Sequence, residues 1–403
     1  MSNRNISIVN DRCCGCRACG DVCPKTCISF ISDKEGFAYP VVDSVNCIDC
    51  GKCAKVCPVL NINKGESVSS SSVACYAKEE ERRMLGSSGG YFGLLAEYVL
   101  AQGGVVYGAA FDNQLRVVHR VATNKEQLVQ LYKSKYIQSN PQGVYNSVLR
   151  ALELEKMVLF CGTPCQCNAV RNVVGGHDER LYLVDFVCHG VPPQQLFDEC
   201  VHWIEKKRGI KVTRFTFRYK DQDTTHPRSY GIEYSKHGRS YKKQGLYYDI
   251  PFYYGFHQYL FLRPSCYSCK WSTVERCADI TLGDYWGINK IDRSFDEYQG
   301  VSLVLFNTEK GHQLSQYVGT KDSCSYKELP LETAILNNSA LCQPTKFPIQ
   351  RDAFFRDYHS FGFDYVAQKY LSPRCGFVLK HYYAIPKVLR IFINRSKRVI
   401  WSI

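Results

Sequence analysis

Two stretches near the start of the chain decide its fold: CCGCRACGDVCP at residues 13–24 and CIDCGKCAKVCP at residues 47–58. In each stretch three cysteines are separated by two residues, and a fourth cysteine follows three residues later, directly before a proline. The second stretch repeats the first after 34 residues. An internal repeat of this kind indicates two copies of one small unit.

This cysteine spacing is that of bacterial ferredoxins with two [4Fe–4S] clusters, in which the fourth cysteine of each motif binds the other cluster. Zinc sites also use four thiolates, but they do not need eight cysteines in two interleaved groups that each end in Cys-Pro. We interpret Cys14 and Cys27, which lie outside the pattern, as core thiols. The expected metal ligands are Cys13, Cys16, Cys19 and Cys57 for one cluster, and Cys23, Cys47, Cys50 and Cys53 for the other.

Composition indicates where the protein works. The chain has 403 residues, 22 cysteines and a net charge of +13. Residues 1–10 are polar and lack an apolar signal-peptide core, so we expect a cytoplasmic protein whose thiols are reduced and hold metal. The positive charge predicts an acidic partner, for example a ferredoxin-like electron carrier. We do not expect nucleic-acid binding, because the aromatic and basic alternation at residues 214–220 is also ordinary for an edge strand.

The C-terminal tail alternates basic and apolar residues between Lys387 and Trp401. Such a helix fits a peripheral contact with the inner face of the membrane. It fits better a terminal helix whose apolar side packs on the protein itself. Both interpretations stay open.

The pattern along the chain predicts four parts. Residues 1–62 form a two-cluster ferredoxin domain, and the polar, serine-rich residues 63–73 form a linker. Residues 74–290 form a second, larger domain, and residues 291–403 form a C-terminal extension with the basic tail. The fold class is an α+β ferredoxin-like domain followed by an α/β domain with a mixed, mostly parallel sheet.

Periodicity places the expected elements of the second domain. Apolar helical spacing predicts a helix over 91–102, and β-branched runs predict strands at 105–111, 157–160 and 181–186. Alternation of polar and apolar residues over 212–254, with His237-Gly238 at a turn, predicts an antiparallel hairpin added to that sheet. No G-x-G-x-x-G or G-x-x-x-x-G-K-[ST] sequence supports a Rossmann or P-loop nucleotide site.

Several further segments appear in a fixed order behind the cysteine motifs. They are SKYIQS at 134–139, FCGTPCQ at 160–166, DFVCHGV at 185–191, RPSC-x2-C at 263–269 and ADITLGDYWG at 278–287. With the two-cluster unit in front, residues 13–287 resemble the beta subunits of coenzyme F420 hydrogenases and dehydrogenases. Members of that family are FAD-containing reductases, whose organic substrate is a deazaflavin coenzyme in some members and a chlorophyll derivative in a plant branch.

The resemblance implies two [4Fe–4S] clusters and FAD, with hydride transfer to or from an organic substrate. It places Lys135 where its charge would offset the flavin pyrophosphate or stabilise reduced flavin. It implies a flavin site built from Ser87, Ser88, Gly89, Gly90, Ser134, Lys135, Gly162, Thr163, Pro164, Cys165 and Gln166. The alternative is a non-catalytic electron-transfer subunit of a larger redox complex.

Two further candidates are weighed against structural roles. His189 follows an expected strand at the sheet edge where ligands commonly bind, and would donate a proton to substrate; it is equally a structural hydrogen-bonding residue. A third [4Fe–4S] cluster would use Cys266, Cys269 and Cys277, with Cys165 or Cys188 as the fourth ligand. The alternative is that these thiols fill core space.

Overall fold

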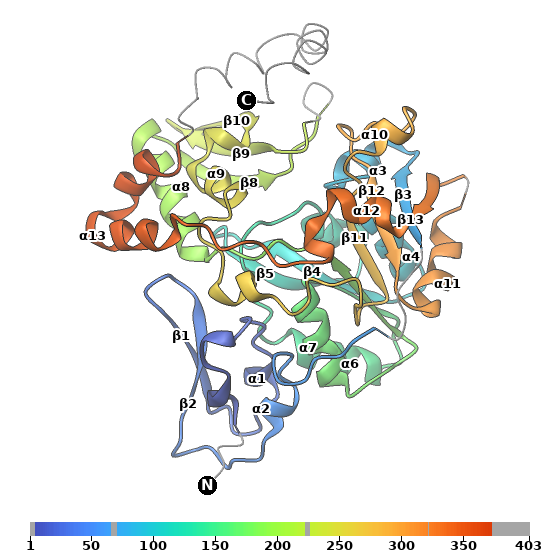
Figure 1. Cartoon of the computed structure of the whole chain (residues 1–403), viewed down its shortest axis with the longest axis horizontal. Coiled ribbons are helices and arrows are strands. Elements are labelled where there is room, and N and C mark those ends of the chain that lie inside the picture. The colour runs from blue at the N-terminus through green and yellow to red at the C-terminus, as the bar shows by residue number, and fades with distance from the viewer. Residues whose placement is uncertain (1–4, 66–70, 222–225, 321, 373–403) are drawn as a thin grey trace, which may run out of the picture.

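The computed structural model describes residues 5–65, 71–221, 226–320 and 322–372. The predicted tail between Lys387 and Trp401 lies outside the described residues. Three parts are visible in Figure 1: a small cysteine-rich unit at the bottom, a large sheet with its helices on the right, and a third group of elements at the upper left. No helix in the described ranges is long and apolar enough to cross a bilayer.

The cysteine-rich unit is small and has the expected hairpin. Strands β1 and β2 pair antiparallel, from Ile28↔Val42 to Ser32↔Ala38. Asp33 closes their turn, because its Oδ1 accepts hydrogen bonds from the amides of Glu35 (2.9 Å) and Phe37 (2.8 Å). The elements are η1 (Ile6–Arg12), α1 (Ala18–Asp21), β1 (Ile28–Ser32), β2 (Ala38–Val42) and α2 (Lys52–Lys55).

The large sheet has eight strands in the order β13-β3-β12-β11-β7-β6-β4-β5. Neighbouring strands β4, β6, β7 and β11 are parallel, and β3 runs in the same direction, whereas β5, β12 and β13 run opposite. The expected mixed sheet with most strands in one direction is therefore confirmed. Its strands are β3 (Ser71–Ala77), β4 (Val105–Phe111), β5 (Val117–Ala122), β6 (Val158–Cys161), β7 (Leu181–Phe186), β11 (Ile280–Asp284), β12 (Ser302–Phe306) and β13 (Cys324–Pro330).

Helices cover both faces of this sheet because alternate strand residues point to opposite sides. Val158 and Phe160 pack with α6 and α7 on one face, whereas Leu159 packs with α4 and α11 on the other. The helices around the sheet are α3 (Glu80–Leu85), α4 (Tyr91–Ala101), α5 (Lys125–Leu128), α6 (Val144–Glu153), α7 (Pro164–Val174), α10 (Ile288–Ile291), α11 (Glu309–Val318) and α12 (Leu331–Asn337).

Two segments differ from the expected division of the chain. Residues 71–73 of the expected linker form the start of β3, because pairing with β12 and β13 on its two sides outweighs their polar composition. The sheet also continues beyond residue 290, since β12 and β13 are two of its strands.

The third group of elements lies between β7 and β11 in sequence, with one helix added from the end of the described chain. The hairpin around His237-Gly238 is confirmed, but β8, β9 and β10 form a separate three-stranded sheet and are not added to the large one. The reason is that apolar residues of β8 and β9 pack against α8, α9 and α13 in a core of their own. These elements are α8 (Gln194–Arg208), β8 (Lys211–Phe217), β9 (Ser229–Lys236), β10 (Arg239–Leu246), α9 (Pro251–His257) and α13 (Arg351–Lys369).

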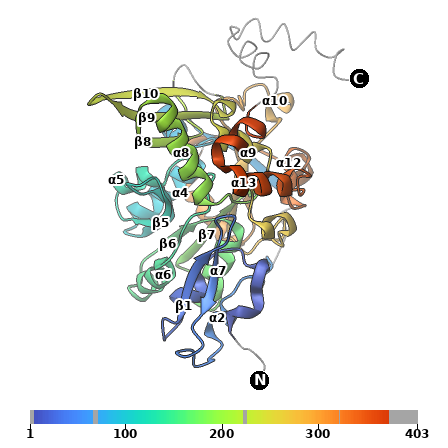
Figure 2. The ribbon, with the colours of Figure 1, turned by 90° about the vertical axis from the view of Figure 1, so that its left-hand side faces the viewer.

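The tip of the β1–β2 hairpin is held by this third group. Arg351 of α13 binds the Glu35 carboxylate, with 3.0 Å between Nη1 and Oε1. A Cβ added at Gly36, where φ is +87°, would lie 3.0 Å from the Gln195 side chain. The cysteine-rich unit therefore contacts the rest of the chain far from its own covalent connection, and Figure 2 shows it below α6 and α7 from a second side.

Candidate functional site

The first thiol set consists of Cys13, Cys16, Cys19 and Cys57, the four residues expected to bind one cluster. Cys19 and Cys57 are buried in one apolar cluster, against which Cys13 packs. Burial raises the pKa of Cys19, and the neighbouring Cys13 and Cys57 raise it further. Cys16 lies within electrostatic reach of the other three. The chain thus brings together three cysteines of the first motif and the last cysteine of the second.

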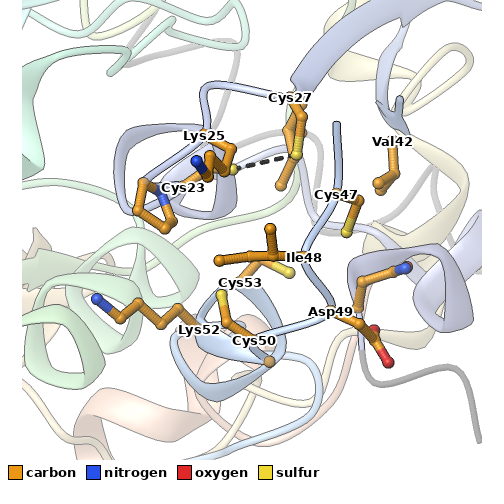
Figure 3. Close-up of a pocket in the computed structure, with 14 residues that line it drawn as sticks. Cys23, Lys25, Cys27, Val42, Cys47, Ile48, Asp49, Cys50, Lys52 and Cys53 are labelled. Atoms are coloured by element: carbon orange, nitrogen blue, oxygen red, sulfur yellow. Dashed lines mark hydrogen bonds between the residues drawn. The ribbon is translucent and has the colours of Figure 1, made fainter. Parts of the chain in front are cut away.

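The second thiol set consists of Cys23, Cys47, Cys50 and Cys53, and these four residues line one pocket. Figure 3 shows their sulfur atoms around a common space. Cys27, expected to be a core thiol, is buried but lines the same pocket, with its Sγ 3.4 Å from Sγ of Cys23. Cys50 is exposed, whereas Cys16, Cys19 and Cys57 are 6–7% exposed. The second set is therefore nearer the surface than the first.

Both sets fit a cubane cluster by their chemistry. Each offers four thiols in apolar surroundings, and left-handed backbone at Gly15 (φ +74°) and Gly51 (φ +71°) lets the loops turn sharply around them. Within the described ranges, no three His, Cys, Asp or Glu side chains come close enough together to bind a single metal ion. The four thiolates of a cubane bind four different irons.

A third thiol set, formed by Cys165, Cys188, Cys266 and Cys269, lies in the domain behind. Cys188 has the other three as electrostatic neighbours, and burial is the main cause of its raised pKa. Burial likewise raises the pKa of Cys266 to about 12. The set draws on the start of α7, the residues after β7 and the η4 turn (Pro264–Ser268).

The expected ligand Cys277 belongs elsewhere. It lies beside Cys167 and Asp185, and its carbonyl accepts a hydrogen bond from Arg171 (2.9 Å). The residues after Cys269 lead the chain to the start of β11, away from the third thiol set. Cys165 and Cys188, which we weighed as alternatives, both join the set instead.

Cys14 connects the first and third thiol sets. Its thiol is half-buried, and the neighbouring thiols of Cys16 and Cys165 both act on its pKa, which is raised. The expectation of a plain core thiol missed this position, because sequence spacing gives no information on which residues of the second domain face the cluster loop. The three sets therefore form a continuous series through the chain.

The expected flavin loop at residues 86–90 precedes α4 and meets the segment 133–139. The Ser134 amide donates to Ser87 Oγ (2.7 Å), and the two hydroxyls are 3.0 Å apart. Gly90 has φ +90° at the N-terminus of α4. A Cβ at Gly89 would lie 2.2 Å from the Cys75 carbonyl, so the loop packs tightly on β3.

Basic side chains that the sequence did not reveal surround this loop. Lys133 Nζ donates to the Gly86 carbonyl (3.1 Å), and Lys220 Nζ donates to the Ser88 carbonyl (2.5 Å). Arg218 donates to the Ser87 carbonyl (2.9 Å) and to both oxygens of Asp284 (2.7 Å each). Burial lowers the pKa of Lys133 to about 7 and that of Lys220 well below its ordinary value.

Lys135 is not a solvated surface lysine. Its Nζ donates to the carbonyls of Tyr132 (2.6 Å) and Gln130 (3.1 Å), and burial lowers its pKa to about 7. The segment that carries it links the two expected flavin loops, because Ser139 accepts a hydrogen bond from Gln166 (2.9 Å).

The second expected flavin loop, residues 162–166, begins α7. Thr163 and Gln166 form a capping box, in which the Thr163 amide donates to Gln166 Oε1 (3.0 Å), and Pro164 occupies the first helical turn. The polar atoms of Thr163 and Gln166 are hydrogen-bonded to each other and to Ser139. Their contribution at the loop is therefore to shape the backbone at Gly162, while Cys165 belongs to the third thiol set.

His189 follows β7 at the carboxyl edge of the parallel strands, as expected. Its Nδ1 is 3.4 Å from Oη of Tyr259, and burial lowers its pKa. His257 is one of its electrostatic neighbours, and burial lowers the pKa of His257 to about 2. Nε2 of His257 and Nε of Arg218 are buried without a hydrogen-bond partner among the described residues. Arg218 also contacts the loop of residues 86–90 through the Ser87 carbonyl, so its unpartnered Nε suits a contact to a bound group there.

Comparisons with known proteins agree with this arrangement. The family model for the C terminus of the coenzyme F420 hydrogenase/dehydrogenase beta subunit matches residues 155–331, and that of the 4Fe–4S dicluster domain matches residues 12–61. A ferredoxin of Rickettsia felis is 41% identical over 54 residues, which are 13% of this chain and 45% of that protein's length.

Among solved structures, the chain is similar to one described as a xenon derivatization of the F420-reducing [NiFe] hydrogenase complex from Methanosarcina barkeri. The identity is 16% and the TM-score 0.42, over 75% of this chain and 91% of that chain. The family models confirm the resemblance seen in the sequence motifs. The chain thus carries, at residues 155–331, the C-terminal domain of the coenzyme F420 hydrogenase/dehydrogenase beta subunit, behind a 4Fe–4S dicluster domain at residues 12–61.

Proposed function

We propose that the protein is a cytoplasmic iron–sulfur flavoprotein oxidoreductase that passes electrons between a ferredoxin-like carrier and an organic substrate through its clusters and FAD. The observation that carries the flavin is the set of basic side chains around the loop of residues 86–90: Lys133, Lys220 and Arg218 donate hydrogen bonds to its carbonyls, and Asp284 pairs with Arg218. Burial lowers the pKa of Lys133 and of Lys220, and an anion bound beside them would stabilise their charged forms. The pyrophosphate of a dinucleotide is such an anion.

The thiol sets supply a route for single electrons. The second thiol set reaches the surface at Cys50 and is the point of contact with an external carrier. Lys25 and Lys52 beside it suit an acidic carrier. The first set lies behind it, and Cys14 joins the first set to the third, for which we propose a third [4Fe–4S] cluster. FAD, when bound, couples such one-electron carriers to two-electron hydride chemistry.

The chain's own residues have separate tasks at the flavin site. Ser87, Ser134 and the Gly89–Gly90 backbone shape the loop, and Lys133, Lys135 and Lys220 supply amines that take up protons when the flavin phosphates bind. His189 and Tyr259 stand at the carboxyl edge of the sheet, where His189 exchanges a proton with the substrate. Its lowered pKa keeps the imidazole neutral near pH 7, so Nδ1 or Nε2 is able to accept a proton.

The test is anaerobic purification of the full chain, followed by iron, sulfide and flavin analysis. Three clusters and one flavin require about twelve irons and one FAD, whereas about eight irons would remove the third cluster from the proposal. The K133M/K220M double variant should lose FAD and keep its iron, while K125M, an exposed lysine on α5, should keep both. Wild-type protein that contains its full iron but does not bind flavin would contradict the proposed flavin-dependent oxidoreductase function. Bound FAD that no organic acceptor oxidises would favour the electron-transfer subunit.

A further inference from the structure

Arg263 is unlike the other buried arginines of this protein. Five arginines are buried in the described ranges: Arg171, Arg218, Arg263, Arg276 and Arg351. Four of them have a carboxylate within 4 Å, and these carboxylates are Asp279, Asp284, Asp185 and Glu35. Arg263 is 0% exposed and, among the described residues, forms no ion pair.

The hydrogen-bond acceptors of Arg263 are all neutral. Its Nε donates to the Cys13 carbonyl (2.6 Å), Nη1 to Gln138 Oε1 (3.0 Å) and Nη2 to the Ala38 carbonyl (3.0 Å). The guanidinium lies over the Tyr39 ring at 4.3 Å. A fully buried charge with neutral partners is expensive unless negative charge lies nearby.

Two sources of negative charge flank this guanidinium. On one side is the first thiol set, since Arg263 binds the carbonyl of Cys13 itself. On the other side is the third thiol set, since the Arg263 carbonyl accepts the Cys266 amide (2.8 Å) and its charge acts on the Cys266 thiol. A [4Fe–4S] cluster with four thiolates is an anion, so clusters in the two sets would neutralise the arginine.

The same residue fixes the geometry between the two sets. Gln138 accepts from Arg263 and donates to the Cys14 carbonyl (3.0 Å), and Ser265 donates to the Cys13 carbonyl (3.1 Å). A Cβ at Gly15 would lie 2.8 Å from Arg263 Nη1, so the cluster loop is pressed against the arginine. Arg263 therefore spans from the turn that carries Cys266 to the loop that carries Cys13.

We propose that Arg263 is a positioning residue for electron transfer between the first and third thiol sets, and that its charge raises the reduction potentials of the clusters bound there. The inference rests on the proposed function. The step moves one electron from the reduced cluster to the oxidised one, with no bond made or broken. A unit charge about 10 Å away, at an effective dielectric constant of about 20, changes such an equilibrium by roughly tenfold.

The test is an EPR-monitored redox titration of anaerobically prepared full-length variants. R263Q should lower the equilibrium constant for reduction of the first-set cluster about tenfold. For a one-electron couple this is a fall of about 59 mV in reduction potential. R12Q removes the same charge from an exposed side chain beside Cys13 and should change that equilibrium less than twofold, because water screens it. R263K should change the equilibrium constant for reduction of this cluster by less than about threefold, since the charge remains.

R263K also separates positioning from charge. A lysine ammonium cannot reach the acceptors at Cys13, Gln138 and Ala38 together, so spin–spin coupling between the reduced first and third clusters should fall in its EPR spectrum. Iron-replete R263Q with unchanged potentials would overturn the charge role, and R263K with unchanged coupling would overturn the positioning role. Loss of all iron from both variants would overturn the proposal, because the residue would then serve folding alone.

Failure of the proposed function gives a different result. Wild-type protein with about eight irons would lack the third cluster, yet the potential of the first cluster would still respond to R263Q.

Discussion

Flavin binding should take up protons, because two lysines near the flavin loop are held uncharged by burial. The pKa of Lys133 and that of Lys135 are each about 7. At pH 8 a group with a pKa of about 7 is about 90% uncharged. An arriving pyrophosphate favours the charged ammonium and returns the pKa toward its ordinary value. Binding of FAD to flavin-depleted, cluster-loaded protein at pH 8 should therefore take up about 0.9 proton per lysine that contacts the phosphates, and about 1.8 for both.

The sign of the pH dependence follows from the same shifts. The folded, flavin-free chain binds fewer protons than the unfolded chain between the folded pKa of about 7 and the ordinary value of 10.5. The destabilisation caused by these lysines is fully present below pH 7 and disappears as the pH rises through that window, so stability increases there. FAD affinity should move in the opposite direction and fall as the pH rises.

The assay is isothermal titration calorimetry in two buffers of different ionisation enthalpy, from which the number of protons exchanged is obtained. K133M should reduce the uptake by about 0.9 proton, and K125M should leave it unchanged. Uptake below about 0.3 proton at pH 8 in the wild type would refute the reasoning, because neither lysine would then sense the bound phosphates.

Three further outcomes are expected. D284N leaves the buried Arg218 without its anion and should lower the free energy of unfolding by about 3–5 kcal/mol in urea titrations. Burial raises the pKa of Asp284, but Arg218 outweighs burial and holds it below the ordinary value of 3.8, so this stabilisation is present above about pH 4 and lost as the pH falls. C188A should lose about four irons while C277A keeps all of them, and equal iron in both would contradict the third thiol set. R351Q should speed amide hydrogen exchange in residues 28–42 by at least about tenfold, since it breaks the ion pair at the hairpin tip; unchanged exchange would show that the pair does not hold the hairpin.

Local sequence rules predicted much of the fold and of the cluster sites. The spacing of eight cysteines gave both thiol sets, because each motif is one short loop whose geometry depends on neighbouring residues. Apolar, β-branched runs placed β4, β6 and β7 for a similar reason. Ser71–Val73 looked like linker, because their strand character depends on partners more than 200 residues away.

The electrostatics of the site could not be predicted in the same way. Arg218 stood in an aromatic and basic pattern that suggested an edge strand, and β8 is indeed an edge strand. Its partner Asp284 lies 66 residues further on, so nothing local marked Arg218 as buried. The family motif at residues 134–139 points to Lys135, although Lys133 is the lysine bonded to the Gly86 carbonyl. Charges that pair across the chain have no period and no spacing to detect.

The ion pair between Arg351 and Glu35 at the hairpin tip limits which ferredoxin domains could replace the dicluster domain. A ferredoxin grafted in its place with all eight ligands would also need an acid at position 35 for Arg351 to bind and a glycine at position 36 for Gln195 to approach. Modularity in this protein thus depends on the hairpin turn as well as on the cysteines. Transplants that carry Glu35 and Gly36 along with the motifs would keep the electron route at its native length.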